Sequence, residues 1–199
     1  LEKFVISQRV MRGGLSVKSV GPIAGAKPFD EFGRRILTMY TGQGPVRIIQ
    51  GITLLTPTWT KVEGISHAWD MRMGTSSIPR EDLAKILAKQ GDPKDIDFRK
   101  KVARFYLQGE RYAEATKELE DILAQFPNDK KIKDELAPSI RALKQLNAKR
   151  ALAELRLRRD AGQHRLILTQ LKNFSSEGVP GEELQAVREM IQEYEALEG

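Results

Sequence analysis

The chain has no cysteine, and only two of its 199 residues are histidine. The absence of cysteine excludes disulfide bonds, thiolate zinc sites, iron–sulfur clusters and cysteine nucleophiles. It does not fix the compartment, because a reducing cytosol and an oxidising exterior both tolerate a cysteine-free chain. The localisation therefore stays open at the level of the sequence.

Long apolar runs are absent as well. The runs that occur are short, such as residues 52–55, so no membrane-spanning helix is expected. The chain begins with Leu1 rather than methionine, and residues 1–10 lack the basic-then-apolar layout of a signal peptide. We therefore expect a fragment of a longer protein or a chain that has been processed.

The charge is uneven along the chain, whose net charge is +6. Residues 1–75 carry ten basic side chains against five acidic ones, and residues 130–165 carry eleven against four. Residues 177–199 reverse the sign, with seven glutamates against Arg188 alone. A basic middle and an acidic end favour either pairing within the chain or two separate partners.

The first 75 residues have the texture of a β-rich module. Short alternating segments are separated by glycine pairs and other turn residues, which is typical of strands and hairpins. The predicted strands cover residues 4–11, 15–20, 36–40, 46–55, 59–63 and 67–73. Residues 21–28 are rich in small residues and are predicted to form a loop, and Pro57 predicts an edge or a bulge after the most apolar strand.

The pattern changes to a helical period at Gly74. Pro79 followed by Glu81 and Asp82 is typical of a helix start, since proline fits the first turn and acids favour the positive end of the helix dipole. Helices are predicted over residues 79–90, 95–108, 111–126, 131–146, 148–161, 164–174 and 181–197. The fold class is therefore α+β, with a β-rich module over 1–75 and an array of helical hairpins over 76–199.

Residues 97–129 carry the most informative pattern. Small residues stand where two helix backbones would approach closely, and large ones fill the space around them. The small residues are Ala103 and Ala115, and the large ones are Val102, Tyr106, Tyr112, Leu119 and Ile122. A turn with Gly109 joins the two helices, and Pro127 ends the second, because proline cannot continue a helix. This segment resembles one tetratricopeptide repeat.

The resemblance implies a non-catalytic interaction or scaffold region. In that family the first helices of successive repeats line a groove that takes a peptide or a partner surface. On this chain the resemblance places Lys100, Arg104 and Gln108 on that face, and their spacing of four puts them on one stripe of the helix. The alternative for this stripe is an ordinary solvated helix face. Unpaired terminal faces of such an array also favour self-association or further repeats.

No residue pattern in the sequence clearly indicates catalytic or cofactor chemistry. Residues 21–28 fail the spacing of a phosphate loop, and Pro28 stands in place of the magnesium-binding hydroxyl. His67 and Asp70 are three apart on a predicted strand, so they point to opposite faces. Glu63 and Asp70 are expected to face each other across a hairpin, which hints only weakly at glycosidase-like chemistry. We expect no enzyme activity, no cofactor and no metal; an enzyme whose active site lies in the β-rich module or outside this segment is the third hypothesis.

Two aromatic residues, Trp59 and Trp69, flank the turn of this hairpin. They are interpreted as the core of a small sheet, because aromatic side chains dominate small cores. An exposed binding platform is the alternative if both lie on one face.

Nucleic acid or another polyanion is the alternative partner. The basic N-terminal module and the helix over 149–159 supply lysine and arginine, as phosphate binding requires. The basic residues of this helix are Lys149, Arg150, Arg156, Arg158 and Arg159. They do not form one patch, and no aromatic RNA-binding motif accompanies them. A solvated helix face, or pairing with the acidic C-terminal helix, is therefore favoured over a polyanion.

Overall fold

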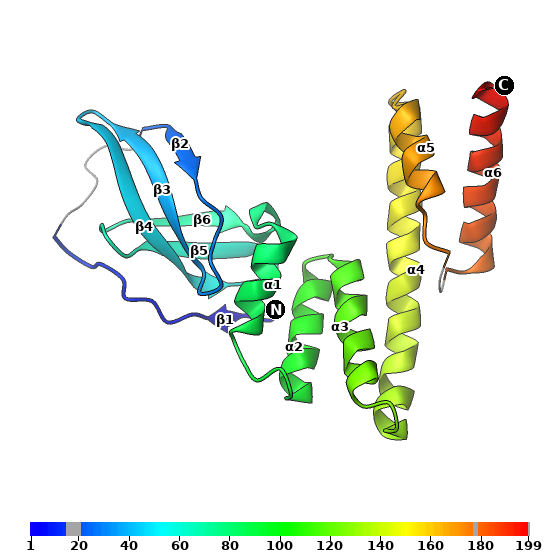
Figure 1. Ribbon diagram of the computed structural model, residues 1–199, viewed down its shortest axis with the longest axis horizontal. Coiled ribbons are helices and arrows are strands. Elements are labelled where there is room, and N and C mark those ends of the chain that lie inside the picture. Colours follow the sequence, from blue (N-terminus) through cyan, green and yellow to red (C-terminus); the bar gives the residue numbers. More distant parts are fainter. Residues whose placement is uncertain (15–20, 177–178, 199) are drawn as a thin grey trace. The chain divides into compact units, whose positions relative to one another are not determined.

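The computed structural model describes residues 1–14, 21–176 and 179–198. The chain forms two compact units, Leu1–Arg111 and Tyr112–Gly199. An antiparallel, curled sheet comes first and a helical region follows it (Figure 1), so the predicted α+β class is confirmed. The helices over 80–88 and 96–108 belong to the same compact unit as the sheet. The domain boundary at 75/76 stays a prediction.

The sheet belongs to the first unit and has the order β2-β3-β4-β5-β6, with β1 paired to β4 outside this path. The strands are β1 (Phe4–Val5), β2 (Ile23–Ala26), β3 (Arg34–Thr41), β4 (Gly44–Leu55), β5 (Trp59–Gly64) and β6 (Asp70–Gly74). All pairings are antiparallel. β4 is long enough to pair with β3 along its first part and with β1 at its end, where Phe4 lies opposite Leu55.

The inner face of the sheet follows from strand alternation. Leu37 lies opposite Ile48, and both are fully buried together with Met39. Trp69 packs against this cluster from the second arm of the β5–β6 hairpin. The predicted hairpin and its register are confirmed, because Glu63 lies opposite Asp70.

One prediction for the sheet is wrong, and a second holds in only one of its two alternatives, a bulge rather than an edge. Residues 21–28 are not only loop, because β2 lies within them and pairs with β3. All four residues of β2 are exposed, so its pairing uses the backbone and leaves no alternation of buried side chains. The apolar strand before Pro57 is central rather than an edge, with β3 and β1 on one side and β5 on the other. Pro57 lies in the following turn, and the predicted bulge occurs earlier, between Ile52 and Leu54.

The N-terminal segment forms less strand than predicted. Only Phe4–Val5 is strand, although Ile6 continues the contact by donating its backbone N–H to Thr53. The partner of β1 is β4, about fifty residues away in sequence. The predicted strand at 15–20 lies outside the described residues.

The helices of the first unit are a short 3₁₀ turn, η1 (Thr75–Ser77), α1 (Arg80–Ala88) and α2 (Ile96–Gln108). α1 buries Leu83, Ile86 and Leu87, as its predicted period requires. Asp95 caps α2 by accepting a hydrogen bond from the backbone of Asp97.

The second unit contains α3 (Tyr112–Gln125), α4 (Lys130–Asp160), α5 (His164–Lys172) and α6 (Gly181–Glu198). α4 is one helix of 31 residues, so the predicted break at Asn147 is wrong. The buried stripe ends at Leu143 and restarts at Ala148. Five residues rotate the stripe by about 140° at 100° per residue. The two halves of this one helix therefore bury different faces. In the sequence, such a phase shift looks the same as a break between two helices.

Each half of α4 has its own partners. The first half packs along α3, and the second half packs against α5 and α6 (Figure 1). The second core contains Leu152, Leu155, Ile167, Leu171, Val187, Met190 and Tyr194. Gly162 turns the chain from α4 to α5 with a positive φ of 73°, which explains the predicted break there. Among the described residues, no helix is both long and apolar enough to cross a membrane.

Candidate functional site

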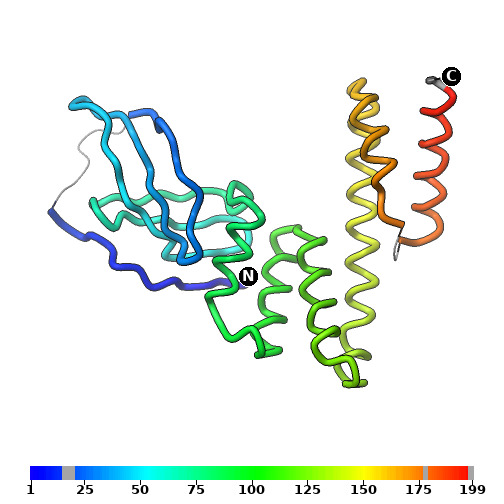
Figure 2. Tube along the Cα trace, viewed as in Figure 1, coloured from blue at the N-terminus to red at the C-terminus, as the bar shows by residue number. Residues whose placement is uncertain are grey.

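The predicted binding stripe lies on α2, where the chain's own N-terminal segment meets it (Figure 2). Arg104 Nε lies 2.6 Å from the Glu2 carboxylate, and Gln108 Oε1 accepts the backbone N–H of Glu2 at 2.6 Å. Lys100 is half-buried on the same helix. Two of the three predicted residues therefore hold a segment of this chain.

An aromatic cluster fixes that segment beside α2. The Phe4 ring lies 5.6 Å from Phe105 and 6.3 Å from Phe98, measured between centroids. The Nζ atom of Lys101 lies 4.4 Å from the centroid of the same Phe4 ring. Such aromatic and cation–π contacts add stability beyond burial alone. The sequence did not predict this role, because the weak alternation around this phenylalanine carries no information about which distant residues its ring contacts.

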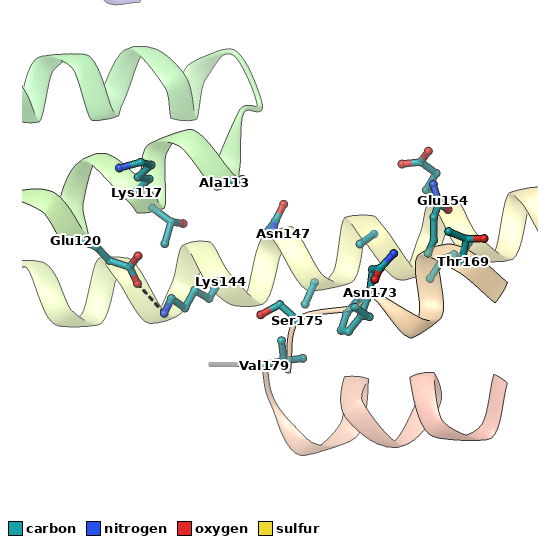
Figure 3. A pocket seen from close by; sticks show the side chains of 16 residues that line it. Ala113, Lys117, Glu120, Lys144, Asn147, Glu154, Thr169, Asn173, Ser175 and Val179 are labelled. Carbon is teal, nitrogen blue, oxygen red and sulfur yellow. Dashed lines mark ion pairs between the residues drawn. The ribbon is translucent and has the colours of Figure 1, made fainter. Parts of the chain in front are cut away.

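A groove with a volume of about 590 Å³ lies within the second unit (Figure 3). Four segments line it: α3, the middle of α4, the end of α5 and the loop that follows α5. The lining residues are Ala113, Thr116, Lys117, Glu120, Lys144, Asn147, Ala148, Ala151, Glu154, Leu155, Thr169, Gln170, Asn173, Phe174, Ser175 and Val179. Its size lies within the range of about 300–1,000 Å³ that is usual for ligand sites.

The groove arises where the buried stripe of α4 changes face. α3 covers the first half of α4, and α5 and α6 cover the second half, so the middle is covered by neither core alone. Ala148 and Ala151 lie at this point, and their small side chains leave room above the helix. The phase shift between Leu143 and Ala148 is the sequence signal for this site, and it was interpreted as a helix break.

The charged side chains that line the groove are paired with other side chains of the second unit. Lys144 Nζ lies 2.7 Å from Glu120, as the dashed line in Figure 3 marks. Lys117 pairs with Asp121 at 2.8 Å, and Glu154 pairs with Arg158 at 2.6 Å. The groove therefore presents no uncompensated charge to a ligand.

The uncharged polar side chains of the groove include some that have a hydrogen-bond partner and others that have none among the described residues. Thr116 and Thr169 donate their hydroxyls to backbone carbonyls one turn earlier in their own helices. The side chains of Asn147, Gln170 and Asn173 are exposed and make no hydrogen bond to any described residue. Three carboxamides, each a donor and an acceptor, are thus available in one concave site.

The basic helix segment over 149–159 is mostly engaged with its surroundings. Lys149 lies 3.9 Å from Glu183 of α6, and Arg159 lies 3.7 Å from Glu193 of the same helix. Of the two predicted alternatives, a solvated face and pairing with the acidic C-terminal helix, the pairing is present at Lys149 and Arg159. Arg150 lies 5.9 Å from the Tyr112 ring, and Arg158 is held by Glu154. Arg156 is exposed.

Of the two acidic residues that lie opposite each other in the hairpin, Glu63 is held by neighbouring side chains. Thr53 Oγ1 donates to Glu63 Oε2 at 2.5 Å, and Lys61 lies 3.1 Å from the same carboxylate. The Thr53 hydrogen bond first, and then Lys61, lower the pKa of Glu63 below its ordinary value. A glycosidase-type general acid needs a raised pKa, which is the opposite shift. Asp70 is exposed on the facing strand.

The two tryptophans lie on opposite faces, so the interpretation that both form the core is wrong for Trp59. Trp69 belongs to the inner face, whereas Trp59 is half-buried on the outer face beneath the Arg72 guanidinium, 4.7 Å from the centroid. Each histidine makes a hydrogen bond, His67 with the adjacent Ser66 and His164 with Tyr194 of α6. Among the residues that the structure describes, no group of three His, Asp or Glu side chains could hold a metal ion.

Comparisons with protein-family models, with curated proteins and with solved structures find no match to this chain. Most positions that carry the repeat pattern are buried, including Ala103, Tyr106 and Ala115, whereas Tyr112 is half-buried. Burial of this kind is common to any helix with one apolar face, so the resemblance to a tetratricopeptide repeat stays a prediction.

Proposed function

We propose that this chain is a non-catalytic protein-interaction region that docks a partner in the groove of its second unit. The observation that carries the proposal is a concave site of about 590 Å³ whose carboxamides Asn147, Gln170 and Asn173 make no hydrogen bond to any described residue. Exposed polar groups that converge on a concave surface favour a binding site over a structural role. The proposal keeps the scaffold function implied by the tetratricopeptide-like pattern but moves the site from α2 to the groove.

The polyanion alternative has less support. Binding to phosphates needs cations that are free to neutralise them. Two of the five basic residues at 149–159 already face glutamates of α6, and Arg158 faces Glu154.

Affinity capture with the full chain tests the proposal. The bait is compared with Ala113→Trp, which adds bulk to an exposed lining residue of α3. Ala124→Trp is the matched control, because Ala124 is exposed on the same helix but does not line the groove. A third variant replaces Lys100, Arg104 and Gln108 by alanine.

We expect a protein that the unaltered chain and Ala124→Trp both retain and that Ala113→Trp loses. Loss only in the triple alanine variant would return the binding site to α2. Equal retention by all four baits, or recovery of nucleic acid alone, would contradict the proposal.

A further inference from the structure

We infer that the groove binds an extended, uncharged polypeptide segment mainly through the main chain of that segment. This inference rests on the proposed function and specifies the chemistry of the partner. It draws on three properties of the groove: its open carboxamides, its internal charge balance and its alanine floor.

The carboxamides favour an extended segment over a helix as the ligand of the groove. Each side-chain amide offers an N–H and a C=O, which complement the C=O and N–H of one peptide group. The main chain of a helix satisfies these groups internally, so a helical ligand could reach Asn147 and Asn173 only with its side chains. An extended segment has unsatisfied peptide groups at its edges and can use both amides. Asn147 projects from α4 and Asn173 ends α5, so they lie on two different elements of the groove (Figure 3).

The charge balance decides which side chains the segment carries. Lys144, Lys117 and Glu154 each already have a partner of opposite charge within 2.8 Å. A charged ligand side chain would compete with one of these pairs or enter without a counter-charge, and burying an unpaired charge is unfavourable. Electrostatic complementarity therefore favours a segment that is neutral across the contact.

The floor of the groove decides the polarity of the side chain that faces α4. Ala148 is buried and Ala151 is half-buried, with Leu155 and Phe174 beside them in the lining. This surface is apolar, and its two alanines leave room above α4, so it favours an apolar side chain without requiring a small one. Burial of such a group adds affinity in proportion to the apolar area removed from water.

Selection from a phage-displayed library of short random peptides against the full chain tests the inference. Selected peptides are synthesised, and their affinities are measured by fluorescence anisotropy. Each is then remade with single main-chain N-methyl groups, which remove one N–H and leave the side chains unchanged. The protein variant is Asn147→Ala with Asn173→Ala, and Gln192→Ala on α6 is the control for an exposed amide outside the groove.

We expect neutral peptides with an apolar side chain at the position that faces α4. Binding should weaken about tenfold or more in the double variant, as the loss of two hydrogen bonds predicts. It should weaken similarly on N-methylation at alternate positions, and Gln192→Ala should bind normally.

Four results would overturn the inference. Selected peptides with a consistent charge, or affinities that N-methylation leaves unchanged, would show a different mode of peptide binding while the proposed function stands. Binding of the same peptides to the Ala113→Trp variant would place their site elsewhere. If no peptide is selected and affinity capture also retains no protein, both the inference and the proposed function fail.

Discussion

The side-chain amides of the groove differ from two amides of the first unit. In the first unit, Gln50 is fully buried and accepts a hydrogen bond from Arg35 Nε at 2.6 Å, and Gln108 accepts the backbone N–H of Glu2. In the second unit, the three amides of the groove have no partner among the described residues. The same chemical group therefore joins segments at two positions of the first unit and is exposed without a described partner in the groove of the second.

This difference shows why a polar stripe on a helix is weak evidence for a binding site. Arg104 and Gln108 have the spacing of a ligand face, yet the N-terminal segment of the chain meets them. Asn147 was predicted as a break point, yet it lines the groove. Whether a polar side chain is free for a partner depends on distant parts of the chain, which periodicity does not report.

The largest expected effect is on the contact between the N-terminal segment and α2. Phe4→Ala removes a ring that is 5% exposed and contacts Phe98 and Phe105, so we expect a loss of about 3 kcal/mol in the free energy of unfolding. Urea unfolding followed by tryptophan fluorescence measures it, because Trp59 and Trp69 both belong to the first unit.

The neighbouring Val5→Ala variant is the control for Phe4. Val5 is 75% exposed, so its truncation should change stability by less than about 0.5 kcal/mol. Equal effects of the two variants would show that the segment does not hold α2 through its aromatic contacts.

The buried amide of the first unit should come next in size. Gln50→Ala leaves the Arg35 Nε–H without its acceptor on the inner face of the sheet. We expect a loss of about 1–3 kcal/mol, the usual cost of an unsatisfied buried polar group. The control is Gln43→Ala, at an exposed position after β3, and the same unfolding measurement applies. A neutral result for Gln50→Ala would remove the contrast between the two units.

A smaller, pH-dependent effect is expected at Glu63. Its pKa is lowered in the folded state, so ionisation contributes stability above the ordinary value of 4.5, and this contribution is lost as pH falls through the lowered pKa. Glu63→Gln should therefore be less stable than the unaltered chain at neutral pH, with a difference that shrinks in acid. Unfolding curves at a series of pH values measure this difference.

Thr53→Val checks the cause of that shift. It removes the hydrogen bond to Glu63, so the remaining pH dependence should be weaker than in the unaltered chain. A stability difference between Glu63→Gln and the unaltered chain that does not change with pH would contradict the assigned cause.

The smallest effect on stability is expected in the groove. Because Asn147 and Asn173 are exposed and make no hydrogen bond within the described residues, the double alanine variant should unfold within about 0.5 kcal/mol of the unaltered chain. Thermal unfolding followed by far-UV circular dichroism measures it. A large loss of unfolding free energy would mean that these amides stabilise the fold rather than being available to a ligand.

Local periodicity was sufficient for much of the architecture. The β5–β6 hairpin, its register at Glu63 and Asp70, and most helices were predicted because alternation and helical period are properties of neighbouring residues. The β2 strand was missed because its residues bury nothing and pair through the backbone alone. The pairing of β1 with β4 was missed because it joins distant segments.

The candidate site was less predictable than the fold. The signal was present as a five-residue step in the buried stripe of α4, from Leu143 to Ala148. A step of this size is compatible with a break between two helices or with one helix that changes its buried face. The choice depends on where α3 and α5 pack, and no short-range pattern contains that information.

Side-chain amide NMR would show whether a ligand occupies the groove or α2. The Asn147 and Asn173 NH₂ signals of the isotopically labelled full chain are followed during titration with a peptide selected by phage display, together with the backbone amides of α2. We expect shifts of both asparagine signals and unchanged amides at Lys100, Arg104 and Gln108. Shifts at these three residues with unmoved asparagine signals would contradict binding in the groove.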